Sequence, residues 1–488
     1  MKYLSDLLKN IEITECGTES GIEIGGISAD SRRVKKGDLF VAIKGGASDG
    51  NAYINDAVKN GAVAVVSDDK VCASCGLPYV IVKDIREAYA FLSASFFDNP
   101  AADMRFIGVS GTNGKTTIAH MIYHILSANG IRAGLTGTIG NIIGGEVGAA
   151  DMTTPDPYEF FGILRKMKDC GTEAAVSEVS AHAVYLKKIN PILADVAVFT
   201  NCSQDHLDFF ETMEKYESVK KSYFTKKHAR TVVLNADDRV GVEIINASDA
   251  KVVSYGIKNP SDVFAVNIRL SVNGSVFFAN IFDDIAEVRI PLPGLFNVYN
   301  SLAAMTAARL LNISLRDAGD ALASLPEIPG RFNFIPSDRG SFILDYAHSP
   351  DGLKKILTAA KSLSKGKVIS VFGCGGNRDR AKRPLMGRIS ADCSDFTVIT
   401  SDNPRFEEPQ KIMSDIEKGL QGITEQYMNI IDREEAIKRA YEMSGKNDIV
   451  VVAGKGAEPY IDIKGIKYEY SDRKAIERVI NGKRTETV

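Results

Sequence analysis

A glycine-rich segment of this chain has residue types suited to phosphate chemistry. Residues 111–117 read Gly-Thr-Asn-Gly-Lys-Thr-Thr. Glycines let backbone N–H groups close around phosphate oxygens, and a following helix N-terminus adds partial positive charge. Lys115 can reach the terminal phosphates, and the hydroxyl of Thr116 can bind Mg²⁺. The segment therefore predicts an ATP site made of Gly111, Thr112, Asn113, Gly114, Lys115, Thr116 and Thr117.

The flanking residues predict the strand and the helix that such a loop requires. Phe106, Ile107 and Val109 indicate a short buried strand before the loop, and apolar residues over 118–126 recur at helical spacing. Gly130 is placed to end that helix. A strict phosphate-binding loop has glycine where this chain has Val109. The alternative is a tight glycine turn without a nucleotide, which the order of strand, loop and helix disfavours.

Composition limits the class of protein. The chain has 488 residues, 44% hydrophobic and 25% charged, which is typical of globular proteins with about three domains. A net charge of −3 gives no reason to expect nucleic acid or a membrane surface as partner. No apolar run is long enough to span a bilayer, and the first residues lack the apolar stretch of a signal peptide. Seven scattered cysteines suggest reduced thiols, so we expect a cytoplasmic protein, and we expect it to be a monomer.

The order of apolar and helical segments predicts an α/β protein of three domains. Residues 1–100 contain apolar strands at 38–43 and 61–66. Residues 101–330 begin with the phosphate loop, so we expect a central ATPase-like domain with a parallel sheet. Residues 331–488 alternate strands and helices, which predicts a Rossmann-like C-terminal domain.

Four strands expected in the last segment each lead into a polar or glycine-bearing loop. They span 342–344, 368–372, 397–400 and 449–452. In a parallel sheet the carboxyl ends of strands meet at one edge, where ligands bind. Charges of both signs would gather there, which suits an amino acid: Arg378, Asp402, Asn403, Arg405 and Glu458. The alternative is a set of ordinary turns with solvated charges.

Further motifs occur along the chain in a recognisable order. They are Thr153-Thr154-Pro155, Glu178-Val179-Ser180-Ala181-His182, Asp205-His206-Leu207-Asp208, Tyr216-Glu217-Ser218-Val219-Lys220, Asn297-Val298-Tyr299-Asn300, Gly330-Arg331, Asp345-Tyr346-Ala347-His348, Asp402-Asn403-Pro404-Arg405 and Gly454-Lys455-Gly456. With the phosphate loop, this order resembles the Mur ligase family over nearly the whole chain. The most similar members add the third residue of the peptidoglycan stem peptide.

The resemblance implies an ATP-dependent ligase that forms an amide bond. ATP would phosphorylate the side-chain carboxylate of D-glutamate in UDP-N-acetylmuramoyl-L-alanyl-D-glutamate, and an incoming amine would displace the phosphate. Such chemistry depends on positioning and charge neutralisation. The implied catalytic groups are Lys115, Glu178, His206 and Lys220.

The resemblance also implies magnesium and a modified lysine. Thr116, Glu178 and His206 would hold Mg²⁺, and Lys220 would be carbamylated and bind a second Mg²⁺. From the residues alone, each assignment has an alternative. His206, like His182, could instead be a buried hydrogen-bonded histidine. Lys220, with Lys221, could instead belong to a solvated helix face.

The remaining implied contacts divide among the three domains. The adenine nucleotide would meet Asn297, Asn300, Arg331 and Asp345 between the second and third domains. The uridine diphosphate would meet the N-terminal domain at Asp30, Ser31, Gly46, Ala47 and Ser48. The muramoyl-dipeptide would meet Thr153, Thr154, Ser180 and Lys188, and the amino acid would meet Arg378, Asp402, Asn403, Arg405, Gly454 and Glu458.

Four positions depart from the family pattern. Leu186 and Lys188 stand where the family often has glutamine and arginine, so a substrate hydrogen bond at Leu186 is in doubt. Ala457 replaces the usual histidine, and Asn333 replaces an acidic residue. None of these positions is among the implied phosphate or Mg²⁺ ligands.

Three alternatives concern the substrate and the activity. The added amino acid is either meso-diaminopimelate or L-lysine, and Arg405 with Arg378 favours the one with a second carboxylate. A folylpolyglutamate synthase-like ligase is the second interpretation, disfavoured by the first segment and by residues 402–405. A nucleotide-binding scaffold without turnover is the third, disfavoured because Lys115 and the implied metal ligands are present.

Overall fold

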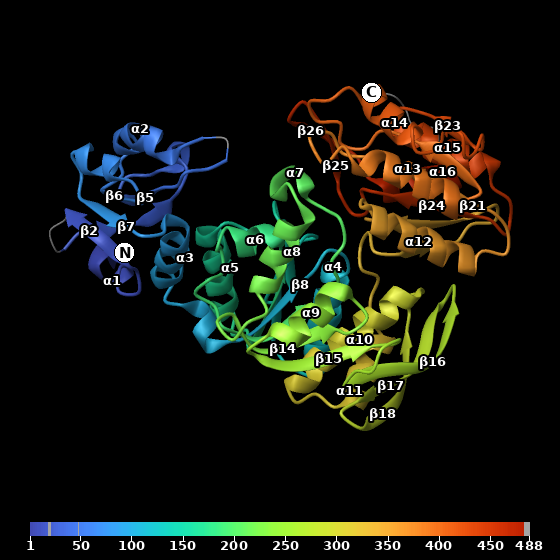
Figure 1. Cartoon of the computed structure of the whole chain (residues 1–488), viewed down its shortest axis with the longest axis horizontal. Coiled ribbons are helices and arrows are strands. Elements are labelled where there is room, and N and C mark those ends of the chain that lie inside the picture. The colour runs from blue at the N-terminus through green and yellow to red at the C-terminus, as the bar shows by residue number, and fades with distance from the viewer. Residues whose placement is uncertain (18–20, 47, 483–488) are drawn as a thin grey trace.

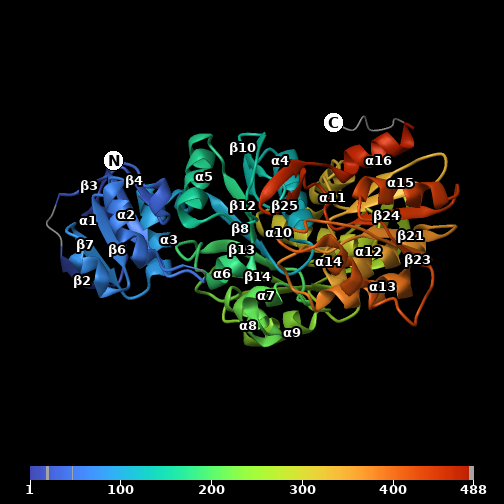
Figure 2. The same cartoon turned by 90° about the horizontal axis from the view of Figure 1, so that it is seen from above.

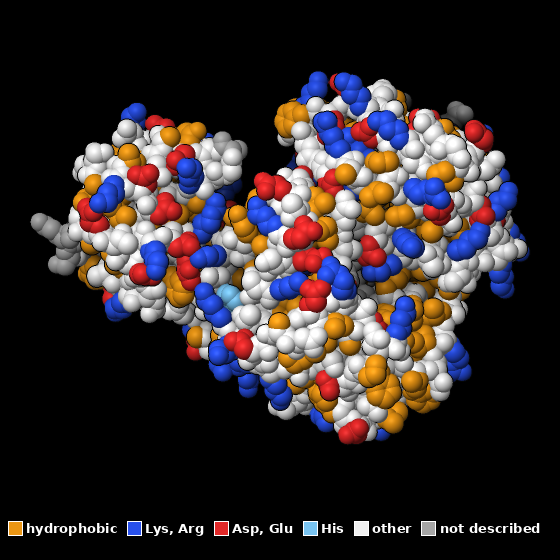
Figure 3. All heavy atoms as spheres, in the orientation of Figure 1, with side chains coloured by type: hydrophobic (Ala, Val, Ile, Leu, Met, Phe, Trp, Pro, Cys, Tyr) orange, Lys and Arg blue, Asp and Glu red, His pale blue; other side chains and the backbone are white. Residues whose placement is uncertain are grey.

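The computed structural model describes residues 1–17, 21–46 and 48–482. Over these residues, three large sheets follow one another along the chain, and each is covered by helices. The N-terminal and C-terminal units lie at opposite ends of the molecule, with the central unit between them (Figures 1 and 2). The space-filling view shows a gap between the two outer units on this face (Figure 3). The predicted α/β class with several parallel sheets is confirmed.

The N-terminal sheet has the strand order β2-β7-β6-β5-β4. All neighbours are parallel except β2 and β7. The strand expected at 61–66 begins only at Ala64, because Gly61 has φ of 105° and belongs to the turn that ends α2. The elements are β1 (Lys2–Tyr3), α1 (Leu4–Leu7), β2 (Ile13–Gly17), β3 (Glu23–Ile24), β4 (Gly26–Ser28), β5 (Asp38–Ala42), α2 (Ile54–Lys59), β6 (Ala64–Ser67), β7 (Tyr79–Val82) and α3 (Ile85–Phe96).

The central sheet has the order β11-β10-β9-β12-β8-β13-β14-β15-β16-β17-β18. Strands β9 to β16 in this order run parallel, and β16 to β18 form an antiparallel meander. The strands are β8 (Arg105–Ser110), β9 (Ala133–Thr136), β10 (Asn141–Ile143), β11 (Glu146–Gly148), β12 (Ala174–Val179), β13 (Ala194–Phe199), β14 (Ala229–Asn235), β15 (Lys251–Gly256), β16 (Val263–Ser271), β17 (Gly274–Ile281) and β18 (Asp284–Ile290).

Helices cover both faces of the central sheet. Apolar residues of α4, α10 and α11 pack on one face, and those of α5 and α9 pack on the other. This burial places β8 and its following loop in the middle of the unit. The helices are α4 (Lys115–Ala128), α5 (Pro157–Asp169), α6 (Ala181–Tyr185), α7 (Leu207–Phe210), α8 (Met213–Ser222), α9 (Arg239–Ala247), α10 (Leu295–Leu310) and α11 (Leu315–Ala323).

The C-terminal sheet has the order β19-β20-β24-β21-β22-β23 and is parallel except for β19. Helices α12, α13 and α14 pack on one face, and α15 and α16 pack on the other. The elements are β19 (Asn333–Ile335), β20 (Ser341–Asp345), α12 (Pro350–Leu363), β21 (Val368–Phe372), α13 (Lys382–Cys393), β22 (Phe396–Ile399), α14 (Pro409–Glu417), β23 (Tyr427–Asn429), α15 (Arg433–Met443), β24 (Ile449–Ala453), β25 (Tyr460–Ile463), β26 (Ile466–Glu469) and α16 (Asp472–Ile480).

No helix among the described residues is long and apolar enough to cross a membrane.

Candidate active site

The glycine-rich loop joins β8 to α4, as its sequence predicts. Gly111 and Gly114 have φ of 148° and 91°, a backbone region that favours glycine. A Cβ on Gly111 would lie 1.9 Å from Oγ1 of Thr200, so the close approach of β13's following loop also requires glycine there. Val109 is buried within β8. The loop therefore requires glycine at these two positions and does not require it at Val109.

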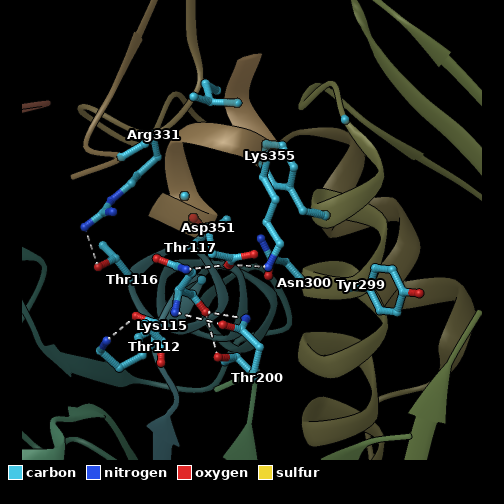
Figure 4. Close-up of a pocket in the computed structure, with 18 of the residues that line it drawn as sticks. Thr112, Lys115, Thr116, Thr117, Thr200, Tyr299, Asn300, Arg331, Asp351 and Lys355 are labelled. Atoms are coloured by element: carbon cyan, nitrogen blue, oxygen red, sulfur yellow. Dashed lines mark hydrogen bonds and ion pairs between the residues drawn. The ribbon is translucent and has the colours of Figure 1, made fainter. Parts of the chain in front are cut away.

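The side chain of Lys115 folds back over this loop (Figure 4). Its Nζ donates to the backbone oxygens of Gly111 at 3.0 Å and Thr112 at 2.9 Å. Burial lowers the pKa of Lys115, and the nearby carboxylates of Glu178 and Asp205 oppose that shift. An ammonium group held against carbonyl oxygens in this way is poised to contact a phosphate.

Glu178 in β12 is a buried carboxylate beside the loop. Its Oε2 accepts hydrogen bonds from the hydroxyls of Thr116 at 2.8 Å and Thr138 at 3.0 Å, and its Oε1 accepts from the backbone N–H of Thr138 at 2.8 Å. The residue is 1% exposed and has no ion-pair partner among the described residues. Because an unpaired buried carboxylate is costly, the position suits a cation.

His206 lies immediately before α7 with an unusual backbone, φ 56°. Burial, with His182, His348 and Lys115 adding to it, lowers the pKa of His206 to about 3 against the attraction of Asp205. The imidazole is therefore neutral at physiological pH, the form that binds metals. Among the described residues, no three His, Cys, Asp or Glu side chains gather as a metal site. The set that the resemblance implies combines Glu178 and His206 with the hydroxyl of Thr116.

Lys220 and its neighbour Lys221 in α8 have opposite environments. Lys220 is 1% exposed, and its Nζ lies 4.7 Å from the centre of the Tyr216 ring. Burial, together with the charge of Lys115, lowers the pKa of Lys220 to about 7. Lys221 is paired with Glu243 near the surface. The solvated-face interpretation is therefore wrong for Lys220.

A cavity of about 760 Å³ opens over the loop between the central and C-terminal units (Figure 4). Asn300, Arg331 and Asp345 line it. Nη2 of Arg331 donates to Oγ1 of Thr116 at 2.9 Å, and its guanidinium lies 4.6 Å from the centre of the Tyr346 ring. Asn297 is buried behind Asn300 and donates to the backbone oxygen of Pro293 at 2.7 Å.

Two cavity residues on α12 were not predicted from the sequence. Oδ2 of Asp351 accepts hydrogen bonds from Nδ2 of Asn113 at 2.8 Å and from Lys355 at 2.7 Å, so the phosphate loop contacts the C-terminal unit directly (Figure 4). The sequence contains a pattern that could have indicated them. Asp351 and Lys355 are four residues apart at the start of a helix, so they lie on one helix face, and that helix follows a strand-end loop.

The residues implied for the dipeptide lie together beside Glu178. Oγ1 of Thr154 donates to the backbone oxygen of Glu178 at 2.8 Å and accepts from the N–H of Ser180 at 3.1 Å. Oγ1 of Thr153 lies 3.0 Å from that of Thr138. Lys188 is buried and pairs with Asp156 at 2.8 Å. Leu186 is half-buried and offers no polar group.

The residues implied for the uridine nucleotide follow neighbouring parallel strands of the N-terminal sheet. Asp30 caps the turn after β4 by accepting from the backbone N–H of Arg32, and Ser31 is buried beside it. Gly46 and Ser48 follow β5 and are exposed. Ala47 lies outside the described residues. Because β4 and β5 are parallel, both loops lie at one edge of this sheet.

The strand-end loops of the C-terminal unit bring part of the predicted amino-acid site together. Nδ2 of Asn403 donates to Oε2 of Glu458 at 2.8 Å, and Lys455 donates to Oδ1 of Asn403 at 2.9 Å and to Oε2 of Glu458 at 3.0 Å. Nη1 of Arg405 donates to the backbone oxygen of Gly376 at 2.7 Å. Lys455, although part of a quoted motif, was not predicted as a site residue.

Other predicted members of that site have partners at its margins. Nη1 of Arg378 lies 3.5 Å from Oδ2 of Asp208 in the central unit. Asp402 is buried, with its Oδ2 4.0 Å from Nη1 of Arg433. A Cβ on Gly454 would lie 2.8 Å from the same oxygen of Asp402. Burial raises the pKa of Asp402, but Lys455 and Arg433 outweigh this and lower it overall, so the group is an anion.

Comparison with known proteins accounts for this arrangement. Three family descriptions match successive parts of the chain: "Mur ligase family, catalytic domain" over 23–97, "Mur ligase middle domain" over 109–308 and "Mur ligase, glutamate ligase domain" over 330–456. The resemblance identified from the motifs is thereby confirmed.

Individual relatives agree over nearly the whole length. A UDP-N-acetylmuramoyl-L-alanyl-D-glutamate--2,6-diaminopimelate ligase of Caldanaerobacter subterraneus is 40% identical and covers 98% of both chains, and one of Aquifex aeolicus is 40% identical over 94% of both. A solved structure of a ligase with the same name is 31% identical, covers 99% of both chains and has a TM-score of 0.69. The chain therefore belongs to the Mur ligase family, whose members are ATP-dependent ligases that form amide bonds.

Proposed function

We propose that this enzyme joins meso-2,6-diaminopimelate to UDP-N-acetylmuramoyl-L-alanyl-D-glutamate, with ATP as the energy source, in peptidoglycan precursor synthesis. The observation that carries the proposal is the pairing of two sites: a phosphate-binding loop with Lys115 and Glu178, and a strand-end site with Arg405, Asn403 and Glu458. Relatives named for this reaction, 40% identical over nearly the full length, support it. Both nucleotide substrates are cytoplasmic, so we place the reaction there, and we propose that the chain acts as a monomer.

The proposed substrate path uses all three units. The loops at 30–31 and 46–48 would bind the uridine diphosphate, and Thr153, Thr154 and Ser180 would bind the dipeptide beside Glu178. Lys188 would contact an anionic group of the dipeptide by leaving Asp156. The gap between the outer units gives this long substrate room on the face shown in Figure 3. The units 1–100, 101–330 and 331–488 would thus bind the uridine nucleotide, ATP and the amino acid.

In the first step, the D-glutamate side-chain carboxylate would attack the terminal phosphorus of ATP. An acyl phosphate forms and ADP leaves. Lys115 would move its ammonium from the loop carbonyls to the transferring phosphoryl oxygens and neutralise their charge. Asn300, Arg331 and Asp345 would hold the nucleoside in the cavity over the loop.

The side chains around Glu178 suit Mg²⁺. They offer a buried carboxylate without a cation and the Thr116 hydroxyl bonded to it, and the neutral imidazole of His206 lines the same cavity. Bound there, Mg²⁺ would neutralise phosphate charge. Thr138 orients the carboxylate by donating its hydroxyl and its N–H.

Lys220 is the proposed site of carbamylation. Carbamate formation joins a neutral amine to CO₂ and releases a proton, so it requires an unprotonated lysine. A pKa of about 7 keeps much of the Lys220 amine neutral at physiological pH. The product would be an anionic oxygen ligand in a buried place that now holds an amine.

In the second step, the amine of the incoming amino acid would attack the acyl carbon. Phosphate leaves and an amide remains. Glu458 and Asp402 would receive the ammonium groups, and Arg405 would bind the far carboxylate through two hydrogen bonds. L-Lysine lacks that carboxylate, so it would leave Arg405 without an anion.

Phosphate release with each substrate set tests the proposal. We expect turnover only when ATP, the muramoyl-dipeptide nucleotide and meso-diaminopimelate are all present, with L-lysine at least tenfold poorer in kcat/KM. Equal values for the two amino acids would refute the assigned amino acid. Turnover with a folate and glutamate in place of these substrates would instead support a folylpolyglutamate synthase-like reaction.

A further inference from the structure

Two loops of the C-terminal unit carry the arginines proposed to bind the amino acid. Arg378 follows β21 and Arg405 follows β22, and the two strands are parallel neighbours. The loops are in direct contact: Gly376 donates its N–H to the backbone oxygen of Asn403, and a Cβ on Gly376 would lie 1.9 Å from the backbone oxygen of Pro404. Neither loop can shift without moving the other.

The backbone has a positive φ at Arg405 and at the residue before Arg378. Asn377, just before Arg378, has φ of 53°, and Arg405 itself has φ of 50°. Residues with a Cβ adopt this left-handed region only when their surroundings hold them there. Such a backbone in two touching loops requires a clamp.

A buried ion pair outside the proposed binding site supplies the clamp. Arg383 in α13 is 1% exposed, and its Nη2 and Nη1 donate to the two carboxylate oxygens of Glu407 at 2.9 and 3.1 Å. This two-point geometry fixes the direction of the carboxylate as well as its position. Nη1 of Arg383 also donates to Asp415 at 3.1 Å.

Glu407 transmits this restraint to both loops. Its Oε1 accepts the backbone N–H of Asn377 at 2.6 Å, immediately before Arg378. It stands two residues after Arg405, and its own N–H donates to the backbone oxygen of Pro404 at 3.0 Å. Oδ1 of Asn377 accepts the N–H of Phe406 at 3.1 Å, which closes the connection.

We propose that Glu407, held by Arg383, is a positioning residue that fixes Arg405 and Arg378 at the spacing needed for the second carboxylate of the diamino acid. This inference rests on the proposed function. It assigns Glu407 no contact with substrate. Loosening the clamp should weaken recognition of the far carboxylate and leave ATP binding unchanged, because neither of these two loops lines the cavity proposed for ATP.

The test compares Glu407→Gln with Glu434→Gln. Glu434 forms a two-point pair with Arg478 in the same unit, at 2.8 and 2.6 Å but nearer the surface, so it controls for the loss of a glutamate–arginine pair outside the two loops. We expect Glu407→Gln to raise KM for meso-diaminopimelate about tenfold, the effect of losing one charge-assisted restraint, with KM for ATP and kcat/KM for L-lysine within twofold of the parent. Glu434→Gln should change none of these.

A second variant keeps the test decisive if Glu407→Gln does not fold. Glu407→Asp retains the charge but shortens the reach, and we expect a smaller rise in the same KM. Thermal unfolding of each variant identifies a loss of fold. A folded Glu407→Gln enzyme with the parent's KM and preference, or one in which KM rises equally for all three substrates, would overturn the inference. A parent enzyme that uses neither diamino acid would instead refute the proposed function.

Discussion

The phosphate-binding loop and the amino-acid loops both lie at the carboxyl ends of parallel strands, yet they are held in different ways. The phosphate loop adopts its shape through Gly111 and Gly114, which tolerate positive φ. The amino-acid loops have positive φ at Arg405 and Asn377, which carry side chains; arginine rarely adopts this backbone, and ion pairs and neighbouring loops restrain the two loops. A site of the first kind is encoded in adjacent residues, whereas one of the second kind depends on residues far apart.

The largest effect is expected at the phosphate loop. Lys115→Ala removes the ammonium that faces the loop carbonyls, and we expect kcat to fall by about a thousandfold because one preorganised charge at a developing anion is lost. Thermal unfolding should be nearly unchanged, since no core contact is removed. Lys166→Ala, at an exposed position of α5 that does not line the cavity, is the control and should retain activity. Turnover of Lys115→Ala within threefold of the parent would exclude the assigned role.

The phosphate loop could be predicted because all of its parts are close together in the sequence. Residues 106–130 contain the strand, the glycines, the lysine and the helix, so nothing distant was needed. The α/β class and the strands at 342–344, 368–372, 397–400 and 449–452 were also predicted, because apolar runs and loop residues alternate clearly.

The unpredicted residues depend on contacts between distant segments. Asp351 touches Asn113 across two units, and Arg383 acts through Glu407, a pairing that no local spacing indicates. The burial of Lys220 between partly exposed neighbours likewise follows from how α8 packs, and the lysine's charge gives no sign of that burial. Sequence reasoning identified motif residues here and could not give their partners.

A second prediction concerns the buried lysine. Lys220→Ala should reduce kcat at least about a hundredfold, and a small added carboxylic acid should restore part of it by replacing the carbamate. Lys221→Ala is the matched control, because that side chain is paired at the surface. Full activity of Lys220→Ala without an added acid would contradict the proposed ligand.

The same lysine gives a pH dependence with a definite sign. The pKa of Lys220 is lowered to about 7, so the neutral amine that reacts with CO₂ increases as pH rises through 7. At fixed dissolved CO₂, we expect carbamylation to increase between about pH 6 and pH 8. Labelled CO₂ trapped on the parent protein, and absent from Lys220→Ala, would measure it. Equal labelling across this range would show that the amine does not titrate as inferred.

A third prediction tests the amino-acid site directly. Arg405→Ala should lower the preference for meso-diaminopimelate over L-lysine about tenfold, because the far carboxylate loses its two-point contact. Alanine also carries a Cβ, so the substitution does not relieve the positive φ at this position. Arg388→Ala, whose arginine pairs with Asp392 on the surface of α13, serves as the control. An unchanged ratio of kcat/KM values in Arg405→Ala would remove this arginine from the specificity site.

The smallest effect is expected at Asn333, where the chain passes from the central unit to the C-terminal unit. Asn333 is 2% exposed; its Oδ1 accepts the N–H of Gly330 at 2.6 Å, and its Nδ2 donates to the backbone oxygen of Ile328 at 2.7 Å. An ionised carboxylate could accept the first bond but not donate the second. We therefore expect Asn333→Asp to lower the free energy of unfolding by about 1–3 kcal/mol at neutral pH, with activity changed less than at Arg405.

The pH dependence of that loss identifies its cause. A buried aspartate facing a carbonyl oxygen would have a raised pKa, so the protonated form, which can donate, is favoured as pH falls. The deficit should be largest above the raised pKa and should shrink towards pH 5. Urea unfolding at pH 8 and pH 5 measures both, with the exposed Asn447→Asp as control. A deficit independent of pH would indicate that the shape of the amide matters and its donor does not. The asparagine at this departure from the family pattern would then act through its shape and the bond that its Oδ1 accepts from Gly330.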